Sequence, residues 1–203
     1  MKKYVAVAGT IGSGKTSLVK WLAKSYGLEP YYEPNDENPY LADFYKDMPR
    51  WAFHSQAFFL AHKLDLHQLL ERSKRSAVID RTIYEDAEIF AKSLRKQKCI
   101  DERDWAVYWH LYEGIVRALR PPDVLIAVSC SLAATKRRIA KRNRAMESDI
   151  PDAYLRGLHR AYEAWFDSYD LSPLVRIDTT KMDYVEDLID LIELRDKVDR
   201  ALR

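Results

Sequence analysis

The chain has 203 residues, of which 47% are hydrophobic and 32% charged, and its formal net charge at pH 7 is only +2. This length is compatible with one domain around one sizeable core. The small net charge excludes a strong overall attraction to nucleic acid or to a membrane, so we expect neither as a partner. Cys99 and Cys130 lack CxxC or metal-ligand spacing, which argues against a disulfide framework and fits a cytoplasmic protein.

Short apolar runs alternate with longer stretches of helical pattern along the chain. The runs cover residues 4–8, 31–32, 77–79, 124–128 and 174–177. The helical stretches cover residues 16–26, 50–72, 84–94 and 105–119. This alternation predicts an α/β fold in three layers, with a five-stranded parallel sheet covered by helices on both faces. We expect one domain over residues 1–203.

Ligands of such sheets bind at the carboxyl ends of the strands, so the residues that close each run are candidate site residues. The first run is followed by GTIGSGKTS, in which Gly9, Gly14, Lys15 and Thr16 satisfy G-x-x-x-x-G-K-[ST]. The glycines allow successive backbone N–H groups to point inward, and the next helix adds its positive N-terminal end. Lys15 can then reach the β- and γ-phosphates, and Thr16 can offer its hydroxyl to Mg²⁺.

The stretch therefore predicts a nucleoside triphosphate site. Its residues are Gly9, Thr10, Ile11, Gly12, Ser13, Gly14, Lys15, Thr16 and Ser17.

Acidic residues close the second and third runs. Glu33 is placed to face the phosphate loop and to accept a proton from an attacking hydroxyl. Asp80 is placed to hold Mg²⁺, and the adjacent Arg81 to neutralise charge where donor and acceptor meet. Asp86 and Phe90 lie one helical turn apart and share a face of the following helix.

The segment KRRIAKRNRAMES, residues 136–148, holds a dense basic cluster, with six Lys or Arg among residues 136–144. Arg138 and Arg142 are four residues apart, so both can reach one side of a helix. A solvated face and a nucleic-acid patch are the alternatives. We favour a mobile lid over about residues 136–150 that brings arginines to the transferring phosphoryl group.

A triphosphate site is compatible with a kinase, a switch protein or a non-catalytic binding module. The switch is disfavoured because Arg81 follows Asp80 where a switch needs a glycine, and because no Asn/Thr-Lys-x-Asp stretch is present. A thymidylate-kinase-like nucleoside monophosphate kinase stays open as the alternative enzyme, although Tyr45 and Glu147 are wrong for holding an acceptor phosphate.

The chain resembles the deoxynucleoside kinases, and within them the bacterial deoxyadenosine/deoxyguanosine kinase branch. The matching segments are GTIGSGKTS, EP at 33–34, NPYLADFY, RWAFHSQAFFL, VIDRTIYEDAEIFA, RIAKRNRAMES and IPDAYLRGLH. The resemblance implies transfer of the γ-phosphoryl group of ATP, with Mg²⁺, to the 5′-hydroxyl of a deoxynucleoside. It also implies a homodimer, for which the aromatic-rich segment 105–116 is a candidate contact helix, although burial in its own core explains that segment nearly as well.

The resemblance also implies roles for individual residues. Glu33 corresponds to the general base and Arg81 to the group that holds the 5′-hydroxyl region and the phosphoryl group. Tyr45 and Glu147 correspond to the pair that grips the 3′-hydroxyl. The residues that correspond to the base pocket are Gln56 and Asp86 on the base edge, Phe90 stacked on the base, and Leu41, Phe44, Trp51 and Phe53 in the wall.

On the donor side the resemblance identifies Arg138, Arg142 and Arg144 as lid arginines. The loop from Asp178 to Asp183 would lie beside the ATP adenine. The chain departs from the animal enzymes at Lys63, where they carry Arg; an ordinary exposed lysine is the alternative there. We expect deoxyadenosine as the substrate, with deoxyguanosine and deoxycytidine as alternatives.

Overall fold

The fold is built on one parallel sheet, which the computed structural model describes together with its helices over residues 2–35, 37–143, 150–182 and 188–202. The strands are β1 (Tyr4–Ala8), β2 (Glu29–Tyr31), β3 (Ala77–Asp80), β4 (Val124–Ser129) and β5 (Leu174–Asp178). Their order is β2-β3-β1-β4-β5, and every neighbouring pair is parallel. The predicted five-stranded parallel sheet is confirmed.

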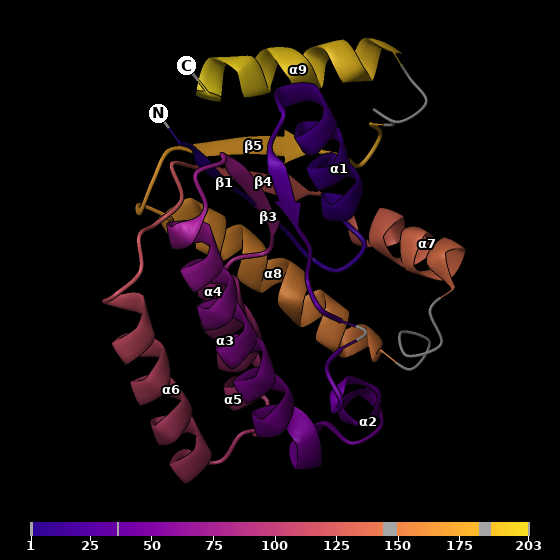
Figure 1. Cartoon of the computed structure of the whole chain (residues 1–203). Helices are drawn as coiled ribbons and strands as arrows, with labels where there is room; N and C mark the ends of the chain where they lie inside the picture. The colour runs from indigo at the N-terminus through magenta and orange to yellow at the C-terminus, as the bar shows by residue number, and fades with distance from the viewer. Residues whose placement is uncertain (1, 36, 144–149, 183–187, 203) are drawn as a thin grey trace.

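Helices connect the strands as the sequence pattern predicts (Figure 1). They are α1 (Lys15–Tyr26), α2 (Leu41–Lys46), α3 (Met48–Arg72), α4 (Ile83–Glu85), the π-helix η1 (Asp86–Ala91), α5 (Lys92–Lys96), α6 (Glu102–Val116), α7 (Leu132–Arg142), α8 (Asp152–Ser168) and α9 (Leu188–Leu202). The stretch 84–94 differs from expectation because its middle is a π-helix rather than α-helix. Such segments are frequent at functional sites.

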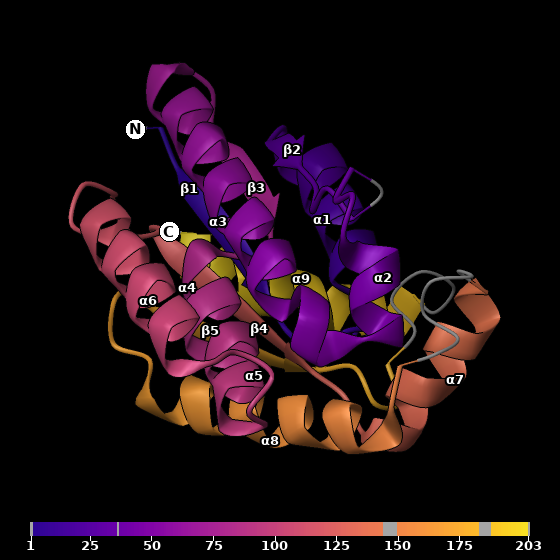
Figure 2. The same cartoon turned by 90° about the horizontal axis from the view of Figure 1, so that it is seen from below.

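Two apolar layers form because successive residues of β1 point to opposite faces of the sheet. Val5 and Val7 pack with α1 and α9 in one buried cluster. Tyr4, Ala6 and Ala8 belong to a second cluster with α3, α6 and α8. Figures 1 and 2 show this arrangement, with α9 along one face and α3, α6 and α8 on the other. The predicted three layers are thereby confirmed.

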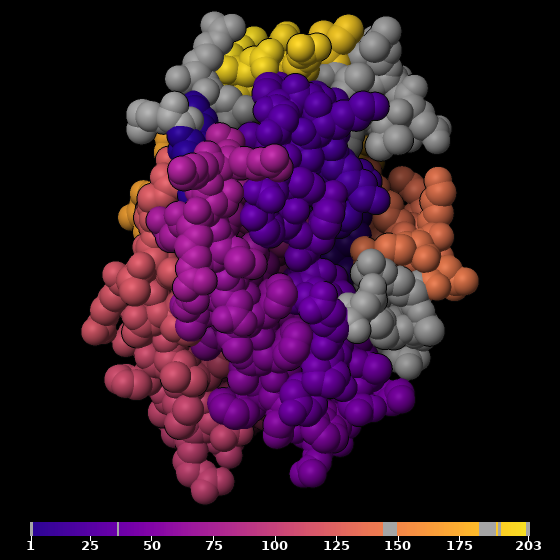
Figure 3. All heavy atoms as spheres, in the orientation of Figure 1, coloured from indigo at the N-terminus to yellow at the C-terminus, as the bar shows by residue number. Residues whose placement is uncertain are grey.

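β1 is the central strand, with β3 and β4 on either side. The loop after β1 therefore begins where the carboxyl ends of three strands meet. In the space-filling view, the N-terminal part of the chain runs over the visible face from α1 to α2 and the start of α3 (Figure 3). This topology brings the 9–17 loop, the end of β3 and the α2–α3 segment to the same edge of the sheet.

Across the part of the chain that the structure describes, we find no helix whose length and apolar character would suit a membrane span.

Candidate active site

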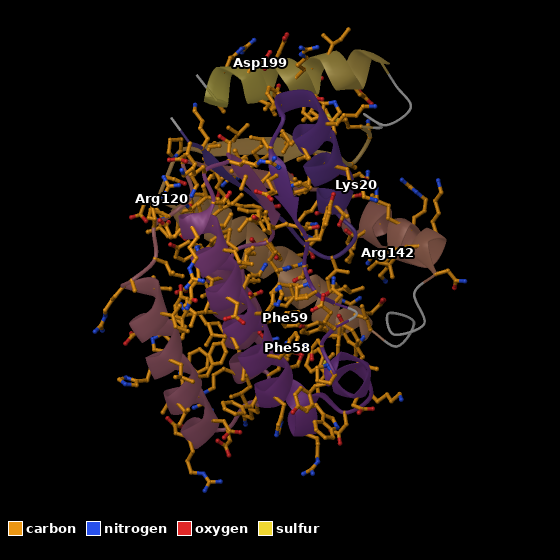
Figure 4. All side chains as sticks on the ribbon, viewed as in Figure 1. Lys20, Phe58, Phe59, Arg120, Arg142 and Asp199 are labelled. Atoms are coloured by element: carbon orange, nitrogen blue, oxygen red, sulfur yellow. The ribbon has the colours of Figure 1, made fainter. Side chains whose placement is uncertain are left out.

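A cavity of about 400 Å³ opens at the carboxyl edge of the sheet. Its lining residues come from the 9–17 loop, α1, the segment after β2, α2, α3, the end of β3, η1, α7 and α8. They are Ile11, Gly12, Lys15, Thr16, Lys20, Tyr32, Glu33, Asn35, Leu41, Phe44, Tyr45, Gln56, Phe59, Asp80, Arg81, Asp86, Phe90, Arg142 and Tyr154. Figure 4 labels Lys20, Phe59 and Arg142, which reach the cavity from α1, α3 and α7. The size suits a small organic ligand.

The 9–17 loop has the backbone that its glycines predict. Gly9 adopts φ +155°, and a Cβ there would lie 2.3 Å from the carbonyl oxygen of Val128 on β4. Gly14 adopts φ +102° immediately before α1. The buried Lys15 ammonium donates to the carbonyl of Thr10 at 3.0 Å, across the loop. Burial, together with the nearby charge of Arg81, lowers the pKa of Lys15.

Asp80 and Thr16, the two residues predicted to bind Mg²⁺, are in contact. The Thr16 hydroxyl donates to Asp80 Oδ2 at 2.6 Å, whereas the buried Asp80 Oδ1 has no hydrogen-bond partner among the described residues. No group of three or more His, Cys, Asp or Glu side chains within the described ranges is arranged to hold a metal ion. One carboxylate and one hydroxyl nevertheless fit Mg²⁺, which takes few protein oxygens and completes its shell with phosphates and water.

The partly buried Glu33 and the buried Arg81 form an ion pair, with Arg81 Nε 2.5 Å from Glu33 Oε1. Arg81 has φ +72°, a left-handed backbone that is uncommon outside glycine. Its guanidinium also lies 4.3 Å from the ring centre of Phe90. Burial alone would raise the pKa of Glu33, but the charges of Arg81, Lys63 and Lys15 outweigh it and lower that pKa.

Lys63 is fully buried, so it is not the ordinary exposed lysine that the sequence left open. Its ammonium donates to the carbonyls of Arg81, at 2.6 Å, and Asp80, at 3.2 Å. It thereby holds the turn in which Arg81 has its unusual backbone. Helical spacing could have indicated this position, because Lys63 lies seven residues after Gln56, two turns along the same face of α3.

Sequence reasoning missed a second carboxylate beside Arg81. Glu85 is fully buried and accepts hydrogen bonds from the Gly9 and Thr82 amides and from the Tyr162 hydroxyl. Burial raises the pKa of Glu85, although Arg81 and the Thr82 amide oppose the effect. The signal that could have found it is the capping-box spacing of Thr82 and Glu85, which the structure contains at the start of α4.

Two acceptors in the cavity lining, Gln56 Oε1 and Asp86 Oδ2, are buried and have no hydrogen-bond partner among the described residues. Burial raises the pKa of Asp86 to about 7, although the charge of Lys63 opposes this. Phe59 and Phe90 line the cavity beside them. Unpaired buried acceptors are rare in folded proteins, because leaving them unpaired is costly, and these two therefore indicate a ligand with N–H donors.

The structure brings most of the sequence-predicted acceptor residues to the cavity but places two elsewhere. Trp51 stacks on Tyr40, and Phe53 packs edge-on against His54. Neither is among the residues that line the cavity. The role in the pocket wall that the resemblance implies for these two residues stays a prediction. The aromatic spacing of α3 could not distinguish these positions from Phe59, which does line the cavity.

Of the predicted lid arginines that the structure describes, one lines the cavity and the other does not. Arg142 lines the cavity, whereas the Arg138 guanidinium donates to the carbonyls of Ser13 at 3.0 Å and Thr179 at 2.6 Å, away from the cavity lining. Asp178, at the end of β5, accepts from the Thr180 amide at 2.8 Å. The remaining predicted site residues, Arg144, Glu147 and Asp183, lie outside the described residues.

A phosphate loop at the end of the central strand, with an acidic strand end and a carboxylate–arginine pair in one cavity, defines a phosphate-loop kinase. A family model described as deoxynucleoside kinase matches residues 5–202 of the chain. The chain belongs to the deoxynucleoside kinase family.

Curated relatives agree with this assignment. The deoxyadenosine/deoxycytidine kinase of Bacillus subtilis (strain 168) is 36% identical over 185 residues, which are 90% of this chain and 85% of that protein. The deoxyadenosine kinase of Dictyostelium discoideum is 35% identical, over 94% of this chain and 78% of its own length. A structure of the M. mycoides deoxyadenosine kinase with bound dATP matches with a TM-score of 0.84 at 28% identity, covering 97% of this chain and 99% of that one. The enzyme is a deoxynucleoside kinase.

Proposed function

We propose that this kinase phosphorylates deoxyadenosine at its 5′-hydroxyl in nucleotide salvage, with ATP as the phosphate donor. The observation that carries the choice of base is the pair of buried, unpartnered acceptors in the cavity lining, Gln56 Oε1 and Asp86 Oδ2. The exocyclic amino group of adenine offers two N–H donors, as that of cytosine does, whereas guanine and thymine present a carbonyl oxygen there. A base with the wrong group leaves buried polar atoms unpaired and is rejected strongly.

The reaction we propose is an in-line displacement. The 5′-oxygen attacks the γ-phosphorus, the bond from that phosphorus to the β–γ bridging oxygen breaks, and ADP leaves. Glu33 takes the 5′-hydroxyl proton. Although its pKa is lowered, it can act as the base because, in a loose transition state, this proton is transferred late. Lys15 and Arg81 stabilise negative charge on the phosphoryl oxygens, and Arg142 adds to this from α7.

Thr16 and Asp80 would hold Mg²⁺, as the free Oδ1 of Asp80 supports. When bound, Mg²⁺ supplies positive charge to the phosphate oxygens and orients them. We place the lid over about residues 136–150 of a single kinase domain spanning residues 1–203. Arg142, the last residue of α7, supports this lid because it lines the cavity.

The test is an initial-rate panel with ATP and Mg²⁺, offering deoxyadenosine, deoxycytidine, deoxyguanosine and thymidine, with dTMP and adenosine as controls. We expect kcat/KM to be highest for deoxyadenosine, with deoxycytidine above deoxyguanosine and thymidine. A preference for deoxyguanosine would overturn the base assignment and spare the reaction. Turnover of dTMP alone would overturn the acceptor as well.

We also propose a homodimer that forms through α3 and α6, in the cytoplasm. Leu69 on α3 and Val107 and Leu111 on α6 are about half exposed, and the two helices pack against each other. Val107 and Leu111 lie one turn apart and form an apolar strip. Replacing both with Asp should yield monomers in light scattering, whereas Leu171→Asp, at an equally exposed site outside these helices, should not. A dimer that persists in the double variant would place the interface elsewhere.

A further inference from the structure

The buried Arg81 lies between two carboxylates, the partly buried Glu33 and the fully buried Glu85. Its Nε is 2.5 Å from Glu33 Oε1, and its Nη1 is 4.0 Å from Glu85 Oε1. A guanidinium in a buried site is attracted to both, and a direct pair with Glu85 would draw it away from Glu33. Another group must therefore keep Arg81 in direct contact with one carboxylate rather than the other.

The Tyr162 hydroxyl occupies the space between Arg81 and Glu85. It accepts a hydrogen bond from Arg81 Nη1 at 2.5 Å and donates one to Glu85 Oε1 at 2.9 Å. Tyr162 is buried on α8, where its ring packs against Phe90 and Phe166. Because the ring is buried and packs against two other rings, the hydroxyl is a fixed spacer that hydrogen-bonds Glu85 and keeps Arg81 from a closer contact with it.

Glu85 also connects this spacer to the phosphate loop. Its Oε1 accepts from the amide of Gly9 at 3.1 Å, and its Oε2 accepts from the amide of Thr82 at 2.7 Å. Capping of α4 explains the Oε2 bond but not the two bonds of Oε1. Contacts therefore run without interruption from Gly9 through Glu85 and Tyr162 to Arg81, and so from the donor site to the proposed base.

We propose that Tyr162 and Glu85 are positioning residues for phosphoryl transfer: the Tyr162 hydroxyl keeps Arg81 on Glu33, and Glu85 fixes this arrangement to the phosphate loop. Neither residue lines the cavity, so neither acts on the substrate directly. The inference rests on the proposed role of Glu33 but not on the choice of base. The test therefore uses whichever deoxynucleoside the wild-type enzyme turns over fastest.

The decisive variant is Tyr162→Phe, which removes the hydroxyl and keeps the ring. Arg81 then moves toward Glu85, and we expect kcat to fall about 10- to 100-fold while both KM values stay within about threefold, as for misplaced catalytic groups. Adding Glu85→Gln removes the competing charge, so the double variant should recover at least about threefold in kcat over Tyr162→Phe alone. Glu85→Gln by itself should raise KM for ATP, because the amide of Gly9 loses its carboxylate partner.

Tyr169→Phe is the matched control. It removes a tyrosine hydroxyl that is bonded only to Ser172 among the described residues and does not line the cavity, so kcat should stay at the wild-type value. Thermal unfolding of each variant and titration of a fluorescent ATP analogue show whether a loss of kcat comes from unfolding or from a displaced Arg81. Wild-type kcat in Tyr162→Phe would overturn the proposal. So would a kcat loss that Glu85→Gln deepens, because both residues would then simply support the fold.

Discussion

The Arg81 guanidinium and the Glu33 carboxylate meet with Nε and Oε1 2.5 Å apart, inside the same cavity as the phosphate loop. Burial of Glu33 alone would favour its neutral form, but Arg81, Lys63 and Lys15 outweigh this and lower its pKa. The carboxylate is therefore ionised throughout the neutral pH range and ready to accept a proton. The same pairing orients it, because Arg81 is itself held by Lys63 through its backbone carbonyl.

Replacing Glu33 with Gln should remove most of the turnover while leaving nucleoside binding largely intact. Gln has the same shape but cannot take the 5′ proton, and such bases contribute about 10²- to 10⁴-fold to rate. Single-turnover rates and nucleoside binding by calorimetry measure the two effects separately. Near-normal turnover of the variant would remove Glu33 from the base role.

Asp86 should make the use of deoxyadenosine depend on pH. Its pKa is about 7, so it is mostly neutral at pH 6 and mostly ionised at pH 8 in the free enzyme. Only the ionised carboxylate accepts freely from the amino group of adenine, so kcat/KM for deoxyadenosine should rise between these values. Lys63 lies close enough to favour the ionised form, whereas Glu33 opposes it.

The control for that profile is Asp86→Asn, in which the rise should disappear because the amide does not titrate. Deoxyguanosine, whose O6 needs a donor, should show the opposite slope in the wild-type enzyme. A deoxyadenosine profile that keeps its rise in the Asn variant would assign the titration to another group.

The same carboxyl should also reduce the stability of the substrate-free enzyme. Its pKa is raised from 3.8 to about 7 in the folded state, so the folded chain binds this proton more tightly than the unfolded chain. Stability is therefore lost as pH rises from about 4 to about 7, by on the order of 4 kcal/mol for this group. Asp86→Asn should raise Tm relative to wild type at pH 8 and much less at pH 4. An equal Tm difference at both values would contradict the link to titration.

The elements that could be predicted from the sequence are those encoded by neighbouring residues. Apolar runs, each closed by a polar residue, located four strands, whereas the short run at 31–32 overlaps β2 only at Tyr31. The phosphate loop is a contiguous motif with its own backbone requirement. The π-helix over residues 86–91 escaped prediction because its hydrogen bonds differ from those of an α-helix by one residue, which the apolar pattern does not resolve.

The network around Arg81 could not be predicted because its partners are distant in the chain. Tyr162 and Glu85 are 77 residues apart, and burial of Lys63 depends on carbonyls 17 and 18 residues away. A charged residue in a helical pattern is usually exposed, and only the folded structure supplies the groups that allow its burial. The contacts of Arg138 could not be predicted for a related reason, since its spacing to Arg142 says nothing of the Ser13 and Thr179 carbonyls that it meets.

Gly9 should tolerate no side chain. The Cβ of an alanine would lie 2.3 Å from the Val128 carbonyl oxygen, which belongs to the backbone of β4 and cannot turn aside. We expect Gly9→Ala to lose ATP binding and about 1–3 kcal/mol of stability as β1 and β4 are forced apart. Gly157→Ala is the matched control: nothing lies within 4 Å of its Cβ in α8, and it should stabilise the enzyme by about 0.5–1 kcal/mol. Nucleotide titration and chemical unfolding of both variants make the comparison, and a Gly9 variant that binds ATP normally would show that the strands can separate at little cost.

Truncating the two described lid arginines should change different kinetic constants, kcat for Arg142 and KM for Arg138. Arg142 lines the cavity, so Arg142→Ala should lower kcat about 10- to 1,000-fold by removing positive charge from the transferring group. Arg138 instead holds the Ser13 carbonyl within the phosphate loop, so Arg138→Ala should mainly raise KM for ATP. Arg137, exposed on the same helix, is the control for loss of charge and should change neither value. The three variants are compared by varying ATP at saturating nucleoside. If Arg138→Ala lost kcat as severely as Arg142→Ala at unchanged KM, then Arg138 would leave Ser13 and reach the phosphoryl group during turnover.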